Sequence, residues 1–127
     1  MDVRTPPLKD RLYREFEYLA ENLPHVYAIT DLVFGRAGAN SLAELAYLKK
    51  PNVLLPLGSA AHHHQEFNAA YFEIQGATLV LKDKKTFVPT LAALWENKAA
   101  IQAMQEALDR IACRDAALKI AHLIVTF

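Results

Sequence analysis

The chain has 127 residues, a length that suits one domain with a buried core and is too short for two. Its fourteen basic and fourteen acidic side chains cancel and form no basic run, which argues against nucleic-acid binding. A single cysteine excludes an internal disulfide, and neither a membrane-spanning apolar run nor a signal peptide is seen, so we expect a cytoplasmic protein.

The predicted elements begin after a proline-containing, charged lead-in over residues 1–12, which we expect to be flexible. Residues 13–19 alternate aromatic and charged side chains, a period of two that predicts a half-covered edge strand. A short helix is expected at 23–29, then a buried strand at 31–34. Residues 39–49 carry apolar side chains at helical spacing and predict the next helix.

The middle of the chain repeats the same alternation of strand and helix. The proline-bracketed run 51–56 predicts a second buried strand, and 58–64 is expected to be a loop. A helix over 65–75, which Gly76 should end, leads to a third buried strand at 77–81. Serial strand-helix-strand units predict an α/β fold, a Rossmann-like parallel sheet with flanking helices. Three further helices are expected, at 86–95, 98–112 and 115–126.

The turn before the helix at 39–49 is a candidate anion site. Gly38 lets the backbone approach a ligand, and Asn40 or Ser41 is expected to cap the helix. The first N–H groups of a helix lie at the positive end of its dipole, so they can bind phosphate without a lysine. Glu44 either closes a capping box with Ser41 or accepts hydrogen bonds from a sugar hydroxyl. A well-capped helix after a tight turn is the alternative without a ligand.

A second candidate segment follows the next strand, at the same edge of the sheet. Ligands of open parallel sheets bind outside the carboxyl ends of the strands, where both segments must lie. His64 and Gln65 begin a helix there, and an imidazole with a carboxamide suits the vicinal hydroxyls of a sugar. Asn68, one turn later, is expected to brace the loop by bonding to its backbone.

The neighbouring His62 and His63 are expected to be solvated rather than to bind a metal. Adjacent side chains in an extended loop point to opposite sides, and no acidic or cysteine partner follows at the spacing of a zinc site. We therefore expect no metal and no other cofactor.

Several motifs occur in a characteristic order from about Tyr13 to the C-terminus. They are Phe16-Glu-Tyr, Leu23-Pro-His, Asp31-Leu-Val-Phe-Gly-Arg-Ala-Gly-Ala-Asn, Glu44-Leu, Lys50-Pro-Asn-Val-Leu-Leu-Pro-Leu and Gln65-Glu-Phe-Asn-Ala-Ala-Tyr-Phe. This set closely resembles the donor-binding half of the MurG family, bacterial GT-B N-acetylglucosaminyltransferases that make lipid II. The resemblance implies a UDP-N-acetylglucosamine site that needs no metal.

Carried over residue by residue, the resemblance implies a role for most of the candidate residues. Glu44 would bind the ribose, and His64 with Gln65 would form hydrogen bonds to the hydroxyls of N-acetylglucosamine. The residues lining the diphosphate would be Gly38, Ala39, Asn40 and Ser41.

Three further residues receive less definite roles from the resemblance. Arg36 matches an arginine before the small-residue turn, where it serves either as a ligand contact or as a structural ion-pair partner. Tyr18 and Leu19 lie where the uracil would meet the backbone.

The chain departs from the family pattern in two ways. No Gly-rich strand-helix-strand segment precedes Tyr13, and the acceptor-binding half, which supplies the catalytic base, is absent. We therefore expect residues 13–127 to form part of a GT-B C-terminal domain, with no catalytic residue and no transferase activity alone. The lipid-linked acceptor would be reached only through a partner chain that carries the acceptor domain. The chain itself is expected in the cytoplasm, with a peripheral position at the cytoplasmic face of the membrane as an option.

Two other interpretations remain open. The chain is either a nucleotide-sugar-binding subunit that needs a partner chain, or a structural, dimerising remnant. Missing strands would leave an open sheet edge, through which the chain could form a homo-oligomer.

Overall fold

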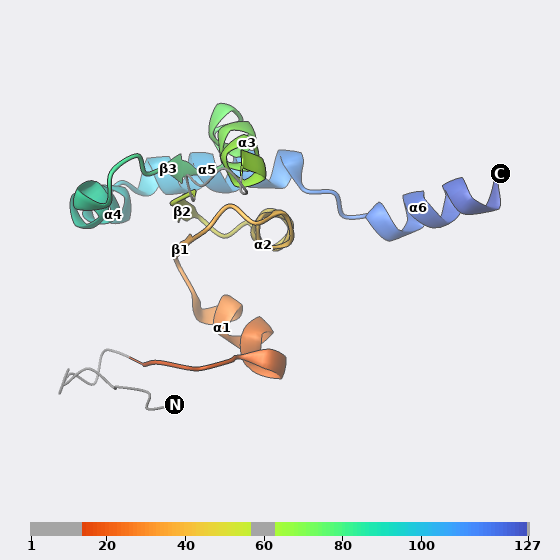
Figure 1. Ribbon diagram of the computed structural model, residues 1–127, viewed down its shortest axis with the longest axis horizontal. Helices are drawn as coiled ribbons and strands as arrows, with labels where there is room; N and C mark the ends of the chain where they lie inside the picture. The colour runs from red at the N-terminus through yellow and green to blue at the C-terminus, as the bar shows by residue number, and fades with distance from the viewer. Residues whose placement is uncertain (1–13, 57–62, 127) are drawn as a thin grey trace.

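The computed structural model describes residues 14–56 and 63–126 and shows an α/β fold (Figure 1). The elements run in the order η1 (Ala20–Asn22), α1 (Leu23–Ile29), β1 (Val33–Gly35), α2 (Ala39–Tyr47), β2 (Asn52–Leu54), α3 (His63–Ile74), β3 (Leu79–Val80), η2 (Lys84–Thr86), α4 (Phe87–Glu96), α5 (Lys98–Ile111) and α6 (Ala116–Val125). The α/β class, a parallel sheet with flanking helices, is thus confirmed.

The sheet has three parallel strands in the order β1-β2-β3. Phe34 of β1 lies opposite Val53 of β2, and Val53 lies opposite Leu79 of β3. Each parallel connection runs through a helix, α2 between the first two strands and α3 between the last two. The carboxyl end of β1 therefore leads into the first candidate segment, and the second candidate segment lies at the start of α3, the next element after β2.

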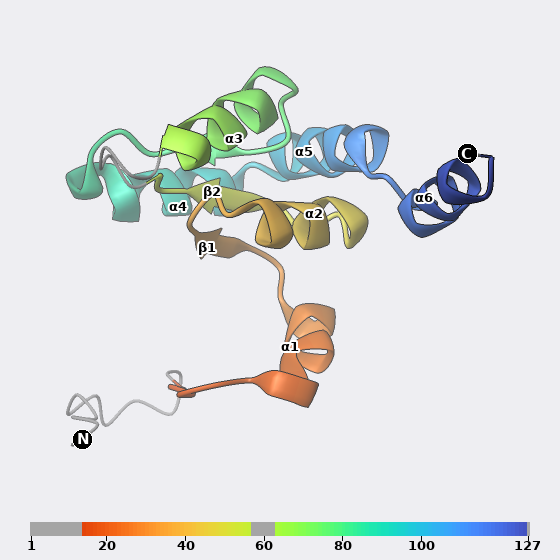
Figure 2. The ribbon, with the colours of Figure 1, turned by 45° about the vertical axis from the view of Figure 1, so that its right-hand side comes forward.

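Neighbouring residues of β2 pack in two separate clusters of buried side chains, because successive side chains of a strand point to opposite faces of the sheet. Val53 belongs to the cluster that includes Leu94 of α4 and Leu108 of α5. Leu54 belongs to the cluster that includes Leu42 of α2 and Ala69 of α3. Helices α2 and α3 thus both pack on the Leu54 side of the sheet, and α5 runs behind them in Figure 2. Every residue of β2 is buried, so the central strand anchors the fold.

The edge strand expected at 13–19 is wrong for the residues that can be described. Residues 14–19 contain no strand, and the chain then enters η1 and α1. A period of two produces a strand only where a neighbouring strand completes its hydrogen bonds, and β1 has only β2 as its partner within the described sheet. Residue 13 and the lead-in at 1–12 lie outside the described residues.

The first strand is shorter and less buried than expected. It covers Val33–Gly35 rather than 31–34, and the Phe34 side chain is 44% exposed. Its ring packs against that of Phe87, with the centroids 4.3 Å apart. The apolar run predicted a strand buried on both faces. The structure instead places β1 at the edge of the sheet, where its side chains are less covered.

The expected helices are found, with small shifts at their ends. Gly76 follows α3 with φ +73°, and its N–H bonds to the Glu73 carbonyl at 2.9 Å, so the predicted C-cap is confirmed. At the end of α2 the same left-handed position is taken by Lys49, with φ +53°, which ends the helix before residue 49.

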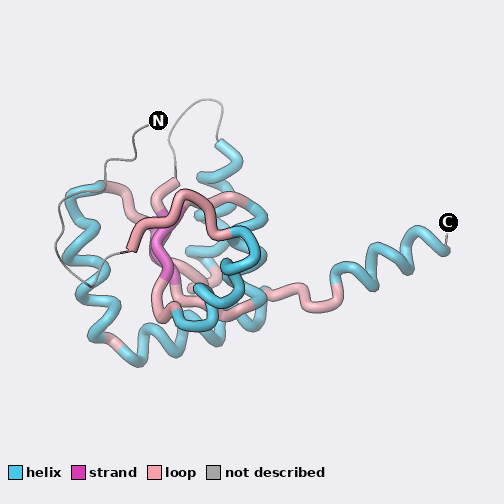
Figure 3. The backbone as a smooth tube through the Cα atoms, turned by 90° about the horizontal axis from the view of Figure 1, so that it is seen from below, coloured by secondary structure: helices cyan, strands magenta, loops and turns pink. Residues whose placement is uncertain are grey.

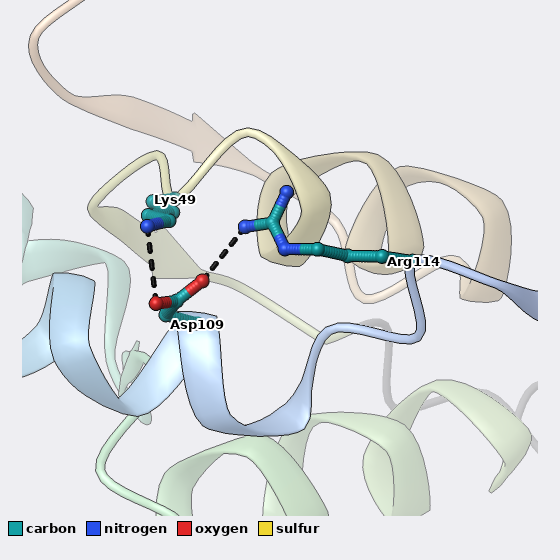
Figure 4. Close-up of polar contacts among 3 residues, drawn as sticks. All are labelled: Lys49, Asp109 and Arg114. Atoms are coloured by element: carbon teal, nitrogen blue, oxygen red, sulfur yellow. Dashed lines mark hydrogen bonds and ion pairs between the residues drawn. The ribbon is translucent and has the colours of Figure 1, made fainter.

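An ion-pair cluster joins the end of α2 to the end of α5 (Figure 4). The Asp109 carboxylate lies 3.0 Å from Lys49 Nζ and 2.7 Å from Arg114 Nη2. The Arg114 guanidinium also lies 5.2 Å from the centroid of the Tyr47 ring. Bonds to Arg114 and then Lys49 lower the pKa of Asp109, an exposed side chain.

The last helix, α6, projects away from the body of the molecule (Figure 3). Its apolar side chains are exposed, including Leu118, Ile124 and Val125 at 74%, 72% and 83%. None of the helices within 14–56 and 63–126 combines the length and apolar character that crossing a membrane requires.

Candidate functional site

Two segments that follow neighbouring strands are joined by one hydrogen bond. Asn68 Nδ2 of α3 donates to the carbonyl oxygen of Ala37, in the turn between β1 and α2, at 3.1 Å. Ala37 is fully buried and Asn68 is partly buried, so water competes weakly for this bond. The bond ties the beginning of α3 to the turn that opens α2, and Asn68 braces this turn.

The N-terminus of α2 presents backbone donors. Gly38 is the N-cap residue, with φ −70° and ψ 138°, and no side chain of the described residues caps it. The first bond within the helix runs from the Leu42 N–H to the Gly38 carbonyl, at 3.0 Å. The N–H groups of residues 39–41 therefore have no partner within the helix, which is the arrangement that binds anions. The predicted cap by Asn40 or Ser41 is wrong, since both already lie inside the helix.

Gly38 stands in open space. A Cβ added there would meet only the Ser41 hydroxyl, at 3.9 Å, and its φ is one that any residue adopts. Neither backbone strain nor crowding within the described structure therefore demands a glycine. No described residue therefore fills the space beside Gly38, at the N-terminus of α2, where we look for a ligand.

Glu44 turns toward α1 rather than closing a capping box. Its Oε2 accepts a hydrogen bond from the Tyr27 hydroxyl at 3.2 Å. Burial, followed by the charge and the hydrogen bond of Glu44, raises the pKa of Tyr27 above its ordinary 10.0. A phenol is protonated at neutral pH in any case, and the raised pKa extends the range over which this hydroxyl can donate to higher pH.

Tyr27 and Glu44 both line a cavity of about 700 Å³ between α1 and α2. Most of its other walls are apolar or carry apolar stems; they are formed by Leu23, Pro24, Ala28, Ala43, Tyr47, Leu48, Lys50 and Cys113. A cavity of this volume falls in the range of small-molecule sites. No pattern in the sequence pointed to Tyr27, because only the packing of α1 on α2 brings it to Glu44.

The start of α3 carries the second group of candidate residues. The helix begins at His63, so the loop expected at 58–64 ends earlier than predicted; His62 and the rest of that loop lie outside the described residues. His64 is exposed, whereas the Gln65 Oε1 is buried without a hydrogen-bond partner among the described residues. His63 pairs with Glu66 at 3.2 Å.

The remaining candidates are more peripheral. Arg36 is exposed, and no carboxylate of the described residues pairs with it, so its structural ion-pair alternative gains no support. Tyr18 is 85% exposed and Leu19 precedes η1; neither lines the cavity beside Glu44. Within 14–56 and 63–126, no three His, Cys, Asp or Glu side chains gather as metal ligands would.

Comparison with known proteins identifies the family. The model of the glycosyltransferase family 28 C-terminal domain matches residues 8–122. Two curated relatives share the name UDP-N-acetylglucosamine--N-acetylmuramyl-(pentapeptide) pyrophosphoryl-undecaprenol N-acetylglucosamine transferase. The protein of Clostridium botulinum strain Hall is 46% identical over 91 residues, which are 68% of this chain and 26% of that protein. The protein of Lachnoclostridium phytofermentans is 38% identical over 114 residues, 81% of this chain and 32% of that protein.

The fold agrees with this assignment. The crystal structure of Acinetobacter baumannii MurG superposes with a TM-score of 0.70 and 24% identity, over 89% of this chain and 32% of that one. The chain thus spans about a quarter to a third of the length of these relatives. It belongs to glycosyltransferase family 28, as a MurG-type C-terminal domain of GT-B fold.

Proposed function

We propose that this chain forms the UDP-N-acetylglucosamine-binding part of an N-acetylglucosaminyltransferase of lipid II synthesis. The observation that supports it most is the Asn68 to Ala37 hydrogen bond, which holds the N-termini of α2 and α3 at one edge of the sheet. Backbone donors for a diphosphate and side-chain donors for a sugar then lie on adjoining segments. The names of the relatives supply the donor and the lipid-linked acceptor.

Each proposed contact follows from the chemistry at its position. The diphosphate lies against the N–H groups of residues 39–41 beside Gly38, and Arg36 adds a positive charge nearby. The ribose hydroxyls donate to the Glu44 carboxylate. The N-acetylglucosamine hydroxyls bond to His64 and Gln65, and the buried Gln65 Oε1 becomes their acceptor.

The reaction itself needs groups beyond this chain. An acceptor hydroxyl, deprotonated by a base, forms the new bond to the anomeric carbon while the bond to the UDP oxygen breaks. The free N–H groups of α2 would stabilise the charge that grows on the departing diphosphate. No carboxylate or imidazole near the site is assigned as the base. We therefore place the base and the lipid-binding surface on an acceptor domain, and the working enzyme at the cytoplasmic face of the membrane.

A titration with UDP-N-acetylglucosamine, with UDP-glucose as the comparison sugar, tests donor binding. A ligand that binds only the folded state, at one hundred times its Kd, raises the free energy of unfolding by about 2.7 kcal/mol. We expect stabilisation that is selective for UDP-N-acetylglucosamine and is lost in Glu44→Ala and Gln65→Ala. Matched controls are Glu106→Ala and Gln102→Ala on α5, whose side chains bond to each other at 3.2 Å. No stabilisation at millimolar UDP-N-acetylglucosamine would refute the proposal.

A structural, dimerising role is the second candidate, and the exposed apolar side chains of α6 favour it. The same titration separates the two, because a structural remnant would be indifferent to nucleotide sugars. A transferase assay with the chain alone should show no turnover, and activity should appear only when an acceptor-domain chain is added.

A further inference from the structure

The contact between Tyr27 and Glu44 joins two helices across the cavity. The residues are 17 positions apart in the chain, and the phenol oxygen lies 3.2 Å from Glu44 Oε2. Tyr27 also packs against the buried cluster that contains Leu42 and Leu45 of α2. The phenol is thus held by the core while its hydroxyl reaches the carboxylate at the cavity wall.

A glutamate on an exposed helix face ordinarily samples several rotamers, and ordering such a side chain costs about 1.5–2 kcal/mol. A hydrogen bond from the partly buried Tyr27 removes part of this cost before a ligand arrives. The Tyr27 hydroxyl engages Oε2, while Oε1 accepts no hydrogen bond from the described residues. A carboxylate has about four acceptor positions, so two remain on Oε1 and one on Oε2.

We propose that Tyr27 is a positioning residue that holds the Glu44 carboxylate ready for the vicinal hydroxyls of a ribose. This inference rests on the proposed function, since it concerns the same nucleotide site. Ser41 and Glu44 are three residues apart and share one face of α2, separated by about 4.5 Å along the helix axis. A nucleotide with its diphosphate at the N-terminus of α2 can therefore bring its ribose to Glu44.

Tyr27→Phe removes the donor and keeps the ring. Loss of one hydrogen bond to a charged group corresponds to about a tenfold weaker affinity for UDP. For 2′,3′-dideoxyuridine diphosphate, which lacks both hydroxyls, the same substitution should leave the affinity unchanged. Tyr71→Phe is the matched control, because Tyr71 is an exposed tyrosine on α3 that does not line this cavity.

The ratio of the affinities for UDP and the dideoxy nucleotide decides the question. If Tyr27 had a purely structural role, Tyr27→Phe would lower the affinity for both nucleotides equally, and this ratio would not change. Equal preference in wild type and Tyr27→Phe, with UDP still bound by the wild type, would overturn this inference alone. A wild-type chain that binds neither nucleotide would overturn the proposed function and this inference together.

A ligand-free measurement covers the case in which Tyr27→Phe does not fold. In protein with ¹³C-labelled tyrosine, the Tyr27 ring should titrate at a higher pH than an ordinary phenol, because burial and the Glu44 charge raise its pKa. Glu44→Gln removes the neighbouring charge and should shift this titration to lower pH. An unchanged titration would show that the two side chains are not coupled and would overturn the inference.

Discussion

Gly38 is the residue at which the requirements of the fold and of a ligand diverge most clearly. Its φ of −70° is ordinary, and an added Cβ would find nothing closer than 3.9 Å. Substitution to alanine lowers the entropy of the unfolded chain and slightly worsens the helix N-cap, two opposing effects of about 0.5–1 kcal/mol each. The fold therefore gives little reason for glycine at this position.

Gly38→Ala should accordingly change the free energy of unfolding by less than about 1 kcal/mol, while weakening UDP binding through contact of the new methyl group with the diphosphate. Urea unfolding and a UDP titration measure the two effects separately. Gly35→Ala, where an added Cβ meets nothing within 4 Å, serves as the control and should bind UDP normally. Unchanged UDP affinity in Gly38→Ala would contradict the phosphate position.

Tyr27 should make the free energy of unfolding depend on pH in the alkaline range. Its pKa is raised above 10.0 in the folded state by burial and then by Glu44, so the folded chain holds this proton more tightly than the unfolded chain does. The stabilisation is complete below pH 10 and is lost as the pH rises through the folded-state pKa. The stability difference between wild type and Tyr27→Phe should therefore shrink above pH 10 in chemical unfolding. A difference that stays constant up to pH 12 would contradict this.

At the scale of elements, the C-terminus of α2 combines an unfavourable backbone conformation with an ion pair. Lys49 adopts φ +53°, where an L-residue loses about 1–2 kcal/mol relative to glycine, and its amino group pairs with Asp109 at 3.0 Å. Lys49→Ala removes the ion pair alone, whereas Lys49→Gly also relieves the backbone. We expect Lys49→Gly to be more stable than Lys49→Ala by about 1 kcal/mol in urea unfolding. Equal stability would show that the backbone there is unstrained.

The ion-pair cluster around Asp109 should raise the free energy of unfolding at neutral pH, and this contribution should be lost at acid pH. Arg114 and then Lys49 lower the folded-state pKa of Asp109 below 3.8, so its contribution is present above that value and disappears as the pH falls through the folded-state pKa. The side chains are exposed, so salt should screen the effect. Wild type and Asp109→Asn should differ at pH 7 in low salt and converge in 1 M salt. Persistence of the difference at high salt would contradict an electrostatic cause.

At the level of the whole fold, two features of the described residues are open: the side of β1 away from β2, where no described strand pairs, and the exposed apolar face of α6. An edge strand and an apolar helix are both surfaces that other chains can cover. We expect concentration-dependent self-association in sedimentation velocity. The double variant Ile120→Glu/Ile124→Glu should reduce it without lowering stability, because both side chains are mostly exposed in the monomer. Val88→Glu on α4, 71% exposed, is the control; a chain monomeric at all concentrations would contradict the expectation.

Much of the architecture could be predicted because its signals are local. Apolar residues at helical spacing marked α2, and a proline-bracketed apolar run marked β2. Gly76 marked the end of α3, since a left-handed position favours glycine. The alternating pattern at 14–19 failed because a strand also needs a partner, which no local pattern reveals.

Some features of the candidate site could likewise be predicted from local sequence, and others could not. Local patterns were enough to predict the order of elements, the glycine turn before α2 and the polar residues at the start of α3, because each depends on neighbours in the chain. The bonds from Asn68 to the Ala37 carbonyl and from Tyr27 to Glu44 emerged only once the chain was folded. Those bonds join residues 31 and 17 positions apart, and their geometry depends on how helices pack across the sheet, a cooperative result of the whole core.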